Sequence, residues 1–153
     1  MYEIINGLHA WNRWFITIVL LVVLYKSFTG WKKKSIFEKA DNTMSLVLMI
    51  LCDLQLLGGL ILYIWLSPQT QAAFNDFGAA MKNSASRFWA VEHIFGMVIA
   101  WVLIHIGRSQ SKKAATDELK HKKLFIFTVI AFLIIMATIP WPGTAANRAL
   151  LPF

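Results

Sequence analysis

The sequence predicts an all-α integral membrane protein, a four-helix transmembrane bundle. The chain has 153 residues, of which 58% are hydrophobic and only 15% charged, and its mean hydropathy is +0.57. The apolar residues form four near-continuous runs instead of periodic faces, and each run approaches the ~20 residues that cross a bilayer. A chain of this length suits one small domain, so residues 1–153 are expected to form a single transmembrane domain. The predicted helices span residues 8–31, 43–66, 87–106 and 124–139.

The residues that flank each run support these helices in turn. Only Glu3 is charged before the first run, and no basic segment or cleavage site marks a signal peptide, so we expect the first helix to be retained. Residues 41–43 offer good N-cap side chains for the second helix, and Ser67–Pro68 ends it. The loop at residues 67–86 is expected to cover the bundle mouth or to form a short surface helix. Pro140 and Pro142 end the fourth helix.

The net charge of +7 is concentrated in two loops. Lysine and arginine residues fill the segments 32–39 and 108–123, whereas the N-terminus before the first helix has none. The positive-inside rule therefore predicts that both loops are cytoplasmic and both termini outside, in a multi-pass protein of the bacterial inner (cytoplasmic) membrane. The basic loops are expected to touch the lipid bilayer surface.

No base-reading motif accompanies the positive charge, which argues against binding to nucleic acid. Cys52 is the only cysteine, which excludes an internal disulfide.

Two acidic residues, Asp53 and Glu92, lie inside the predicted membrane helices. A charged side chain at the bilayer centre costs about 2.5–3.5 kcal/mol on insertion scales, so each should face the bundle interior and find a partner there. The expected partners are His9, Arg13 and His93. Because His9 and Arg13 are four residues apart, they share one helix face. The sequence thus predicts a polar site in the outer half of the bundle.

Haem b is the first candidate ligand for this site. Two histidines on facing helices of a bundle are typical of a bis-histidine haem site, here His9 and His93. Arg13 would neutralise a haem propionate, and Glu92 would orient a ligand histidine. On straight helices the two histidines differ in depth by about 8 Å, which weighs against the pairing.

Two other classes of function remain open for this polar site. A transition metal could be held by His9, His93 and Asp53, the mixed nitrogen and oxygen ligands that suit zinc, iron or copper. The second class is a non-enzymatic role in which Arg13 pairs with Glu92. The polar groups would then form a proton or ion pathway, or stabilise a subunit of a larger complex. No catalytic residue is predicted, so whether the chain is an enzyme stays open. Of the two remaining histidines, His105 is expected near the membrane interface and His121 in solvent.

Five segments together carry a family resemblance: LHAWNRW (8–14), DLQLLGGLILY (53–63), RFWAVEH (87–93), IGRSQSKK (106–113) and IPWP (139–142). The chain resembles a family of small four-helix membrane proteins of Bacteroidetes-type bacteria that are identified as cytochrome b-like. The resemblance covers nearly the whole chain and implies b-type, haem-dependent electron transfer with a redox partner or larger membrane complex. The family pattern has histidine where this chain has Asp53, which weakens the metal and haem readings at that position. The residues that match the family pattern are His9, Arg13, Gln55, Arg87, Glu92 and His93.

Overall fold

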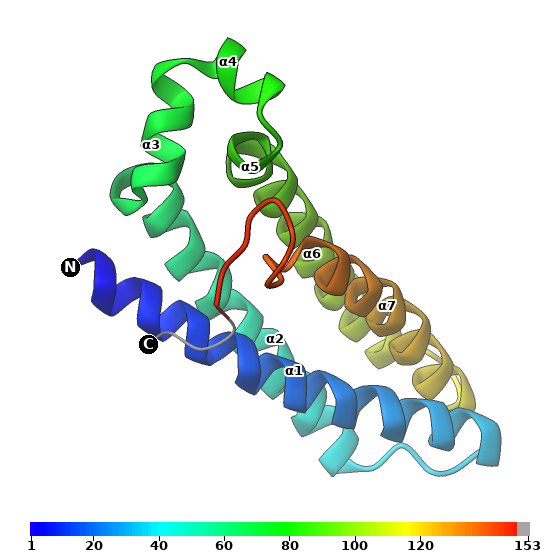
Figure 1. Ribbon diagram of the computed structural model, residues 1–153. Helices are drawn as coiled ribbons and strands as arrows, with labels where there is room; N and C mark the ends of the chain where they lie inside the picture. The colour runs from blue at the N-terminus through cyan, green and yellow to red at the C-terminus, as the bar shows by residue number, and fades with distance from the viewer. Residues whose placement is uncertain (150–153) are drawn as a thin grey trace.

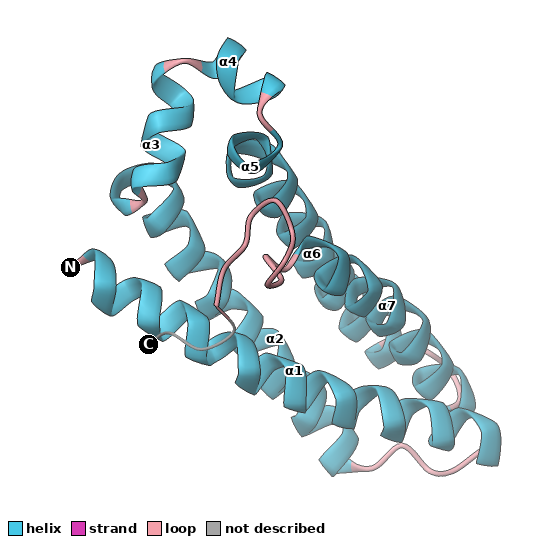
Figure 2. Ribbon diagram, viewed as in Figure 1, coloured by secondary structure: helices cyan, strands magenta, loops and turns pink. Residues whose placement is uncertain are grey.

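The protein is an all-α bundle built on four long helices. The computed structural model describes residues 1–149 and contains no strand in that range. The four predicted membrane helices are confirmed: each lies in a helical segment long and apolar enough to cross a bilayer (Figures 1 and 2). They are α1 (Tyr2–Lys33), α2 (Lys39–Ile61), α6 (His93–Lys112) and α7 (Asp117–Thr138).

The end of the bundle opposite the basic loops carries a set of short helices. A π-helical turn, η1 (Leu62–Leu66), extends α2, and a second, η2 (Phe88–Glu92), leads into α6. Between them the predicted surface helix forms in two main pieces, because Ser67 and Asp76 each cap a new helix start. Figure 1 shows these short helices above the diverging ends of α2 and α6. They are α3 (Pro68–Asn75), α4 (Phe77–Lys82) and α5 (Ser84–Arg87).

Three helix ends extend beyond the apolar runs. The first helix begins at Tyr2 instead of residue 8, which adds about 9 Å. The second begins at Lys39, because Glu38 is the N-cap and forms a capping box with Asp41; the predicted cap at residues 41–43 is therefore wrong. The fourth begins at Asp117, capped by Thr116. Hydropathy marks the part of a helix that suits lipid, whereas capping side chains decide where the backbone starts.

Small residues allow the helices to approach closely. Leu20, Leu48, Ala100 and Ala131 lie in the core where the four long helices meet. A Cβ atom on Gly96 would collide with the side chain of Thr138 on α7, so the glycine is required for this contact. Many large apolar side chains face outward, as expected for a surface covered by lipid: Phe15, Ile18, Leu54, Leu57, Phe95 and Leu133.

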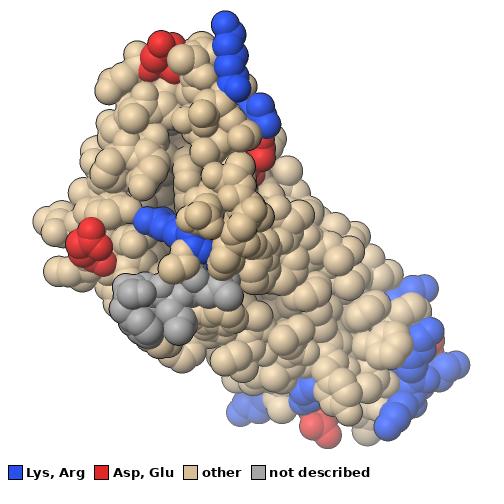
Figure 3. All heavy atoms as spheres, viewed as in Figure 1, with Lys and Arg blue, Asp and Glu red and all other residues tan. Residues whose placement is uncertain are grey.

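Polar contacts stabilise the opposite end of the bundle. Arg108 is buried and donates to the backbone carbonyl of Asn42 at 2.9 Å and to the Ser45 hydroxyl at 2.5 Å, which links α6 to α2. His121 is also buried, packed on Gly30 and the Phe37 ring, so the expectation that it is solvated is wrong. Figure 3 shows basic side chains gathered at this end, where α1 ends and α7 begins.

Candidate functional site

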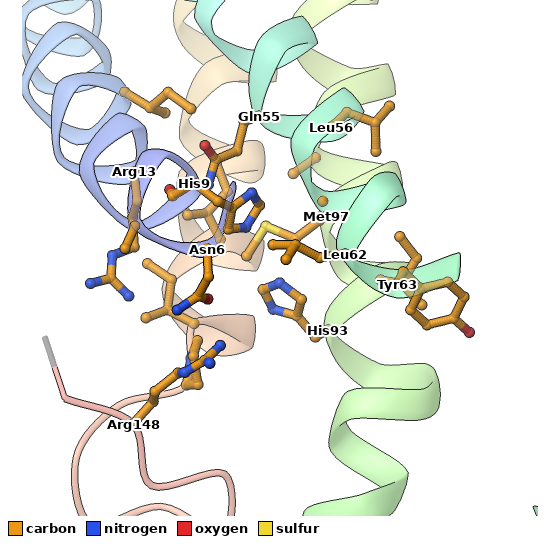
Figure 4. Close-up of a pocket in the computed structure, with 18 of the residues that line it drawn as sticks. Asn6, His9, Arg13, Gln55, Leu56, Leu62, Tyr63, His93, Met97 and Arg148 are labelled. Atoms are coloured by element: carbon orange, nitrogen blue, oxygen red, sulfur yellow. The ribbon is translucent and has the colours of Figure 1, made fainter. Parts of the chain in front are cut away.

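A cavity of about 340 Å³ lies between the helices at the end that carries α3–α5. Its walls come from all four long helices, from η1 and η2 and from the segment that follows α7. Most of the lining is apolar, with two histidines and two arginines and, among the described residues, no aspartate or glutamate. Figure 4 shows His9 and His93 directed toward the same space from α1 and α6. The ionisable and polar residues of the lining include His9, Arg13, Gln55, Tyr63, His93 and Arg148.

His93 is held in one orientation by the end of α7. Its Nδ1 lies 2.8 Å from the backbone carbonyl oxygen of Thr138. A carbonyl only accepts, so Nδ1 carries the proton and the lone pair is on Nε2. The ring also lies against Phe88 and Trp89, with centroids 5.8 and 5.7 Å away. This arrangement leaves Nε2 of a fixed imidazole for a ligand.

Two prolines explain why the Thr138 carbonyl can accept from a side chain. In a continued helix the carbonyls of Met136 and Thr138 would accept from the residues four positions later. Those residues are Pro140 and Pro142, which have no backbone N–H. Thr138 accepts from His93 instead, and the Met136 carbonyl accepts from the indole N–H of Trp141 at 2.7 Å. The IPWP segment thus both ends α7 and orients His93.

His9 is positioned by α2. The backbone carbonyl of His9 accepts a hydrogen bond from the side-chain nitrogen of Gln55 at 2.9 Å. The side-chain oxygen of Gln55 in turn accepts a hydrogen bond from the side chain of Asn12 at 2.9 Å. The imidazole packs on the backbone of Gly59, where an added Cβ would lie 3.1 Å from His9 Cε1. His9 Nδ1 is buried and has no hydrogen-bond partner among residues 1–149. Leaving a buried polar atom unpaired is costly, so this nitrogen requires an explanation.

The predicted depth mismatch between the two histidines does not prevent them from sharing the cavity. Since α1 begins at Tyr2, His9 lies about two helical turns inside the helix and not at its rim. The helices also diverge toward this end (Figure 1), so residues at different heights reach one space. On α6, the π-helical turn η2 immediately precedes His93. Such turns are rare and are frequent at functional sites.

Arginines from two distant segments lie at the cavity. Arg13 lines it, with its guanidinium 5.4 Å from the Trp14 ring. Arg148, which the sequence analysis did not select, also lines the cavity; it donates to the Tyr2 hydroxyl at 2.7 Å and lies 5.2 Å from the Trp89 ring. The only signal for Arg148 was a single cation in the weakly polar segment after the two prolines. It places a second positive charge beside the histidines.

Glu92 is not part of this cavity, contrary to its predicted role. Its carboxylate pairs with Arg87 at 2.7 Å, and the two side chains are 46% and 44% exposed. The orienting contact expected of Glu92 is made by the Thr138 carbonyl, and the expected Arg13–Glu92 pair does not form. Adjacency to His93 in the sequence therefore does not bring Glu92 into the cavity, because its side chain is directed toward Arg87.

Asp53 also lies outside the cavity lining, and the predicted metal set is not assembled. Its Oδ1 accepts from the Trp101 indole N–H at 2.6 Å and lies 3.2 Å from His105 Nε2. Neither Asp53 nor Glu92 therefore lies with His9 and His93 in the lining of the cavity. Within the described part of the chain, no group of three histidine, cysteine, aspartate or glutamate side chains is placed to hold a metal ion.

No protein-family model matches the chain, and no curated protein or solved structure matches it either.

Proposed function

We propose that the protein binds haem b in the cavity between His9 and His93 and transfers electrons within the membrane. The observation that carries this proposal is the pair of histidines on separate helices, directed into one apolar cavity (Figure 4). Helical bundles hold haem with this kind of donor pair. The haem iron would supply one-electron chemistry when bound.

The donor set favours haem over a bare metal ion. A structural or catalytic metal site needs three or four protein ligands, and the described residues offer no such group. Haem brings four nitrogen ligands of its own and needs only two from the protein. His93 offers Nε2, because Nδ1 is engaged by Thr138, and His9 has a buried nitrogen without a partner.

The charges at the cavity favour a ligand that is apolar with an anionic edge. Arg13 and Arg148 line the cavity and place two cationic side chains beside its apolar walls. Arginine binds carboxylates through paired, charge-assisted hydrogen bonds, which suits the two propionates of haem. The apolar walls would exclude water from the macrocycle, an arrangement that tunes haem potentials.

The same charges favour a second candidate, an anionic amphiphile such as a fatty acid held with its carboxylate on Arg13 and Arg148. This candidate needs the arginines and the apolar walls but makes no use of His9 or His93. The two candidates therefore predict different effects of a histidine substitution.

An optical spectrum of the protein purified in mild detergent tests the proposal. We expect a Soret band with sharp α and β bands on reduction, and about one haem per chain. His93→Ala should lose most of the haem, and added imidazole should restore it by filling the vacated position. His105→Gln is the control, because His105 does not line the cavity.

Three outcomes would contradict haem binding. A protein produced with ample haem but lacking any Soret band would do so. Stoichiometric haem with unchanged spectra in both the His93→Ala and His9→Ala proteins would do so as well. Extraction of a tightly bound fatty acid in place of haem would favour the second candidate.

A further inference from the structure

A second polar cluster lies between α2 and α6, outside the cavity. Asp53 Oδ1 accepts from the Trp101 indole N–H at 2.6 Å and lies 3.2 Å from His105 Nε2. His105 Nδ1 lies 2.9 Å from the backbone carbonyl oxygen of Trp101. Both ring nitrogens of His105 are thus within hydrogen-bond distance of an oxygen.

The number of protons in this cluster follows from its donors and acceptors. A neutral imidazole carries one N–H, and a carbonyl and an ionised carboxylate only accept. If Asp53 is ionised and His105 neutral, either tautomer leaves a bare nitrogen against an oxygen, at 2.9 Å or at 3.2 Å. One additional proton between Asp53 and His105 removes this repulsion, because every close nitrogen–oxygen pair then contains a hydrogen.

The membrane environment favours the same protonation. With the extra proton the Asp53–His105 pair is neutral overall, whether as imidazolium and carboxylate or as imidazole and carboxylic acid. Without it the pair carries a net negative charge among apolar, outward-facing side chains such as Leu54, Leu57 and Val102. A net charge inside a bilayer is costly, and no cation other than His105 is in contact with Asp53 among the described residues.

We propose that Asp53 and His105 form a proton-binding site within the membrane, separate from the cavity between His9 and His93. The bound proton lies between Asp53 Oδ1 and His105 Nε2, and its transfer breaks the bond to one atom as it forms the bond to the other. Trp101 connects this site to the cavity, since it lines the cavity and its indole N–H donates to Asp53 Oδ1. The site does not require haem.

Nitrogen NMR and infrared spectroscopy of the protein in lipid bilayers test the proposal near neutral pH. With ¹⁵N-labelled histidine, we expect His105 either as imidazolium or as neutral imidazole accompanied by the C=O band of a protonated Asp53. Its resonances are identified by their loss in His105→Gln. Neutral His105 together with an ionised Asp53 would overturn the proposal, and this wild-type measurement decides the matter without any variant.

Asp53→Asn provides an independent check. The asparagine amide can donate to a neutral Nε2, so the extra proton is no longer needed. We expect His105 to become a neutral imidazole with its proton on Nδ1, and any carboxylic acid band to disappear. Glu118→Gln is the matched control: it neutralises a carboxylate that pairs with Lys34 at 3.6 Å on the surface and should leave His105 unchanged. Imidazolium retained in Asp53→Asn would show that Asp53 does not hold the proton. Haem content is expected to stay the same in both variants, so failure here is distinct from failure of haem binding.

Discussion

His93 on α6 and Thr138 at the end of α7 meet at the cavity through a 2.8 Å contact between the imidazole Nδ1 and the backbone carbonyl. The side chain of the same Thr138 fills the space where Gly96 lacks a Cβ atom. One residue of α7 therefore both orients the histidine and sets how closely the two helices approach. The packing of α6 on α7 and the geometry of the site are consequently linked.

Gly96→Ala should separate α6 from α7. The new Cβ atom would collide with the Thr138 side chain, and overpacking of this kind typically costs about 1–3 kcal/mol. Gly7→Ala is the control, because nothing lies within 4 Å of a Cβ at Gly7 and alanine favours a helix by about 0.5–1 kcal/mol. Thermal unfolding in detergent should show a lower midpoint for Gly96→Ala and an equal or higher one for Gly7→Ala. Equal midpoints in the two variants would show that the contact is not tight.

Gly59→Ala should disturb the histidine site more than Gly58→Ala, although the two residues are neighbours. A Cβ at Gly59 would lie 3.1 Å from His9 Cε1, whereas one at Gly58 would lie 3.7 Å from His9 Nδ1, an ordinary contact distance. The His9 ring must therefore shift in the first variant only. We expect a weaker retention of haem and a shifted α band in Gly59→Ala, and wild-type spectra in Gly58→Ala. Identical spectra in both would place His9 away from the glycine pair.

Arg148→Gln should weaken ligand binding without unfolding the bundle. Hydrogen bonds to charged groups contribute about 1.5–3 kcal/mol, so loss of the guanidinium should raise the Kd for haem roughly 10- to 100-fold. Lys82→Gln is the control, since Lys82 is exposed at the end of α4 and does not line the cavity. Haem titration of the apoprotein measures both constants. An unchanged Kd in Arg148→Gln would show that Arg148 does not hold the anionic edge of the ligand.

The sequence predicted the bundle and the lining residues His9, Arg13 and His93, because apolar length and the four-residue spacing on α1 depend on local helix geometry. Arg148 and the Thr138 carbonyl were missed, since both reach the cavity through the turn after α7, whose path is set by tertiary contacts. The Asp53–His105 pairing depends on how α2 crosses α6, and no pattern within either helix encodes that crossing. The role predicted for Glu92 is wrong because its carboxylate pairs with Arg87 outside the cavity, a contact that adjacency to His93 in the sequence does not reveal.

The orientation of the bundle is the remaining prediction from charge. Basic side chains lie at the end where α1 meets α2 and α6 meets α7, which the positive-inside rule places in the cytoplasm (Figure 3). Ala115→Cys and Ala79→Cys put a thiol on exposed positions at opposite ends. Cys52 is buried and is replaced by alanine in both, so each protein has a single thiol.

We expect a membrane-impermeant maleimide added to intact cells whose outer membrane has been permeabilised to label Ala79→Cys but not Ala115→Cys. Both positions should react once the inner membrane is disrupted, which confirms that each thiol is accessible. Labelling of Ala115→Cys in intact cells would reverse the orientation and place the cavity at the cytoplasmic face. With the predicted orientation the cavity lies near the outer face, so a redox partner of the proposed haem would approach from that side.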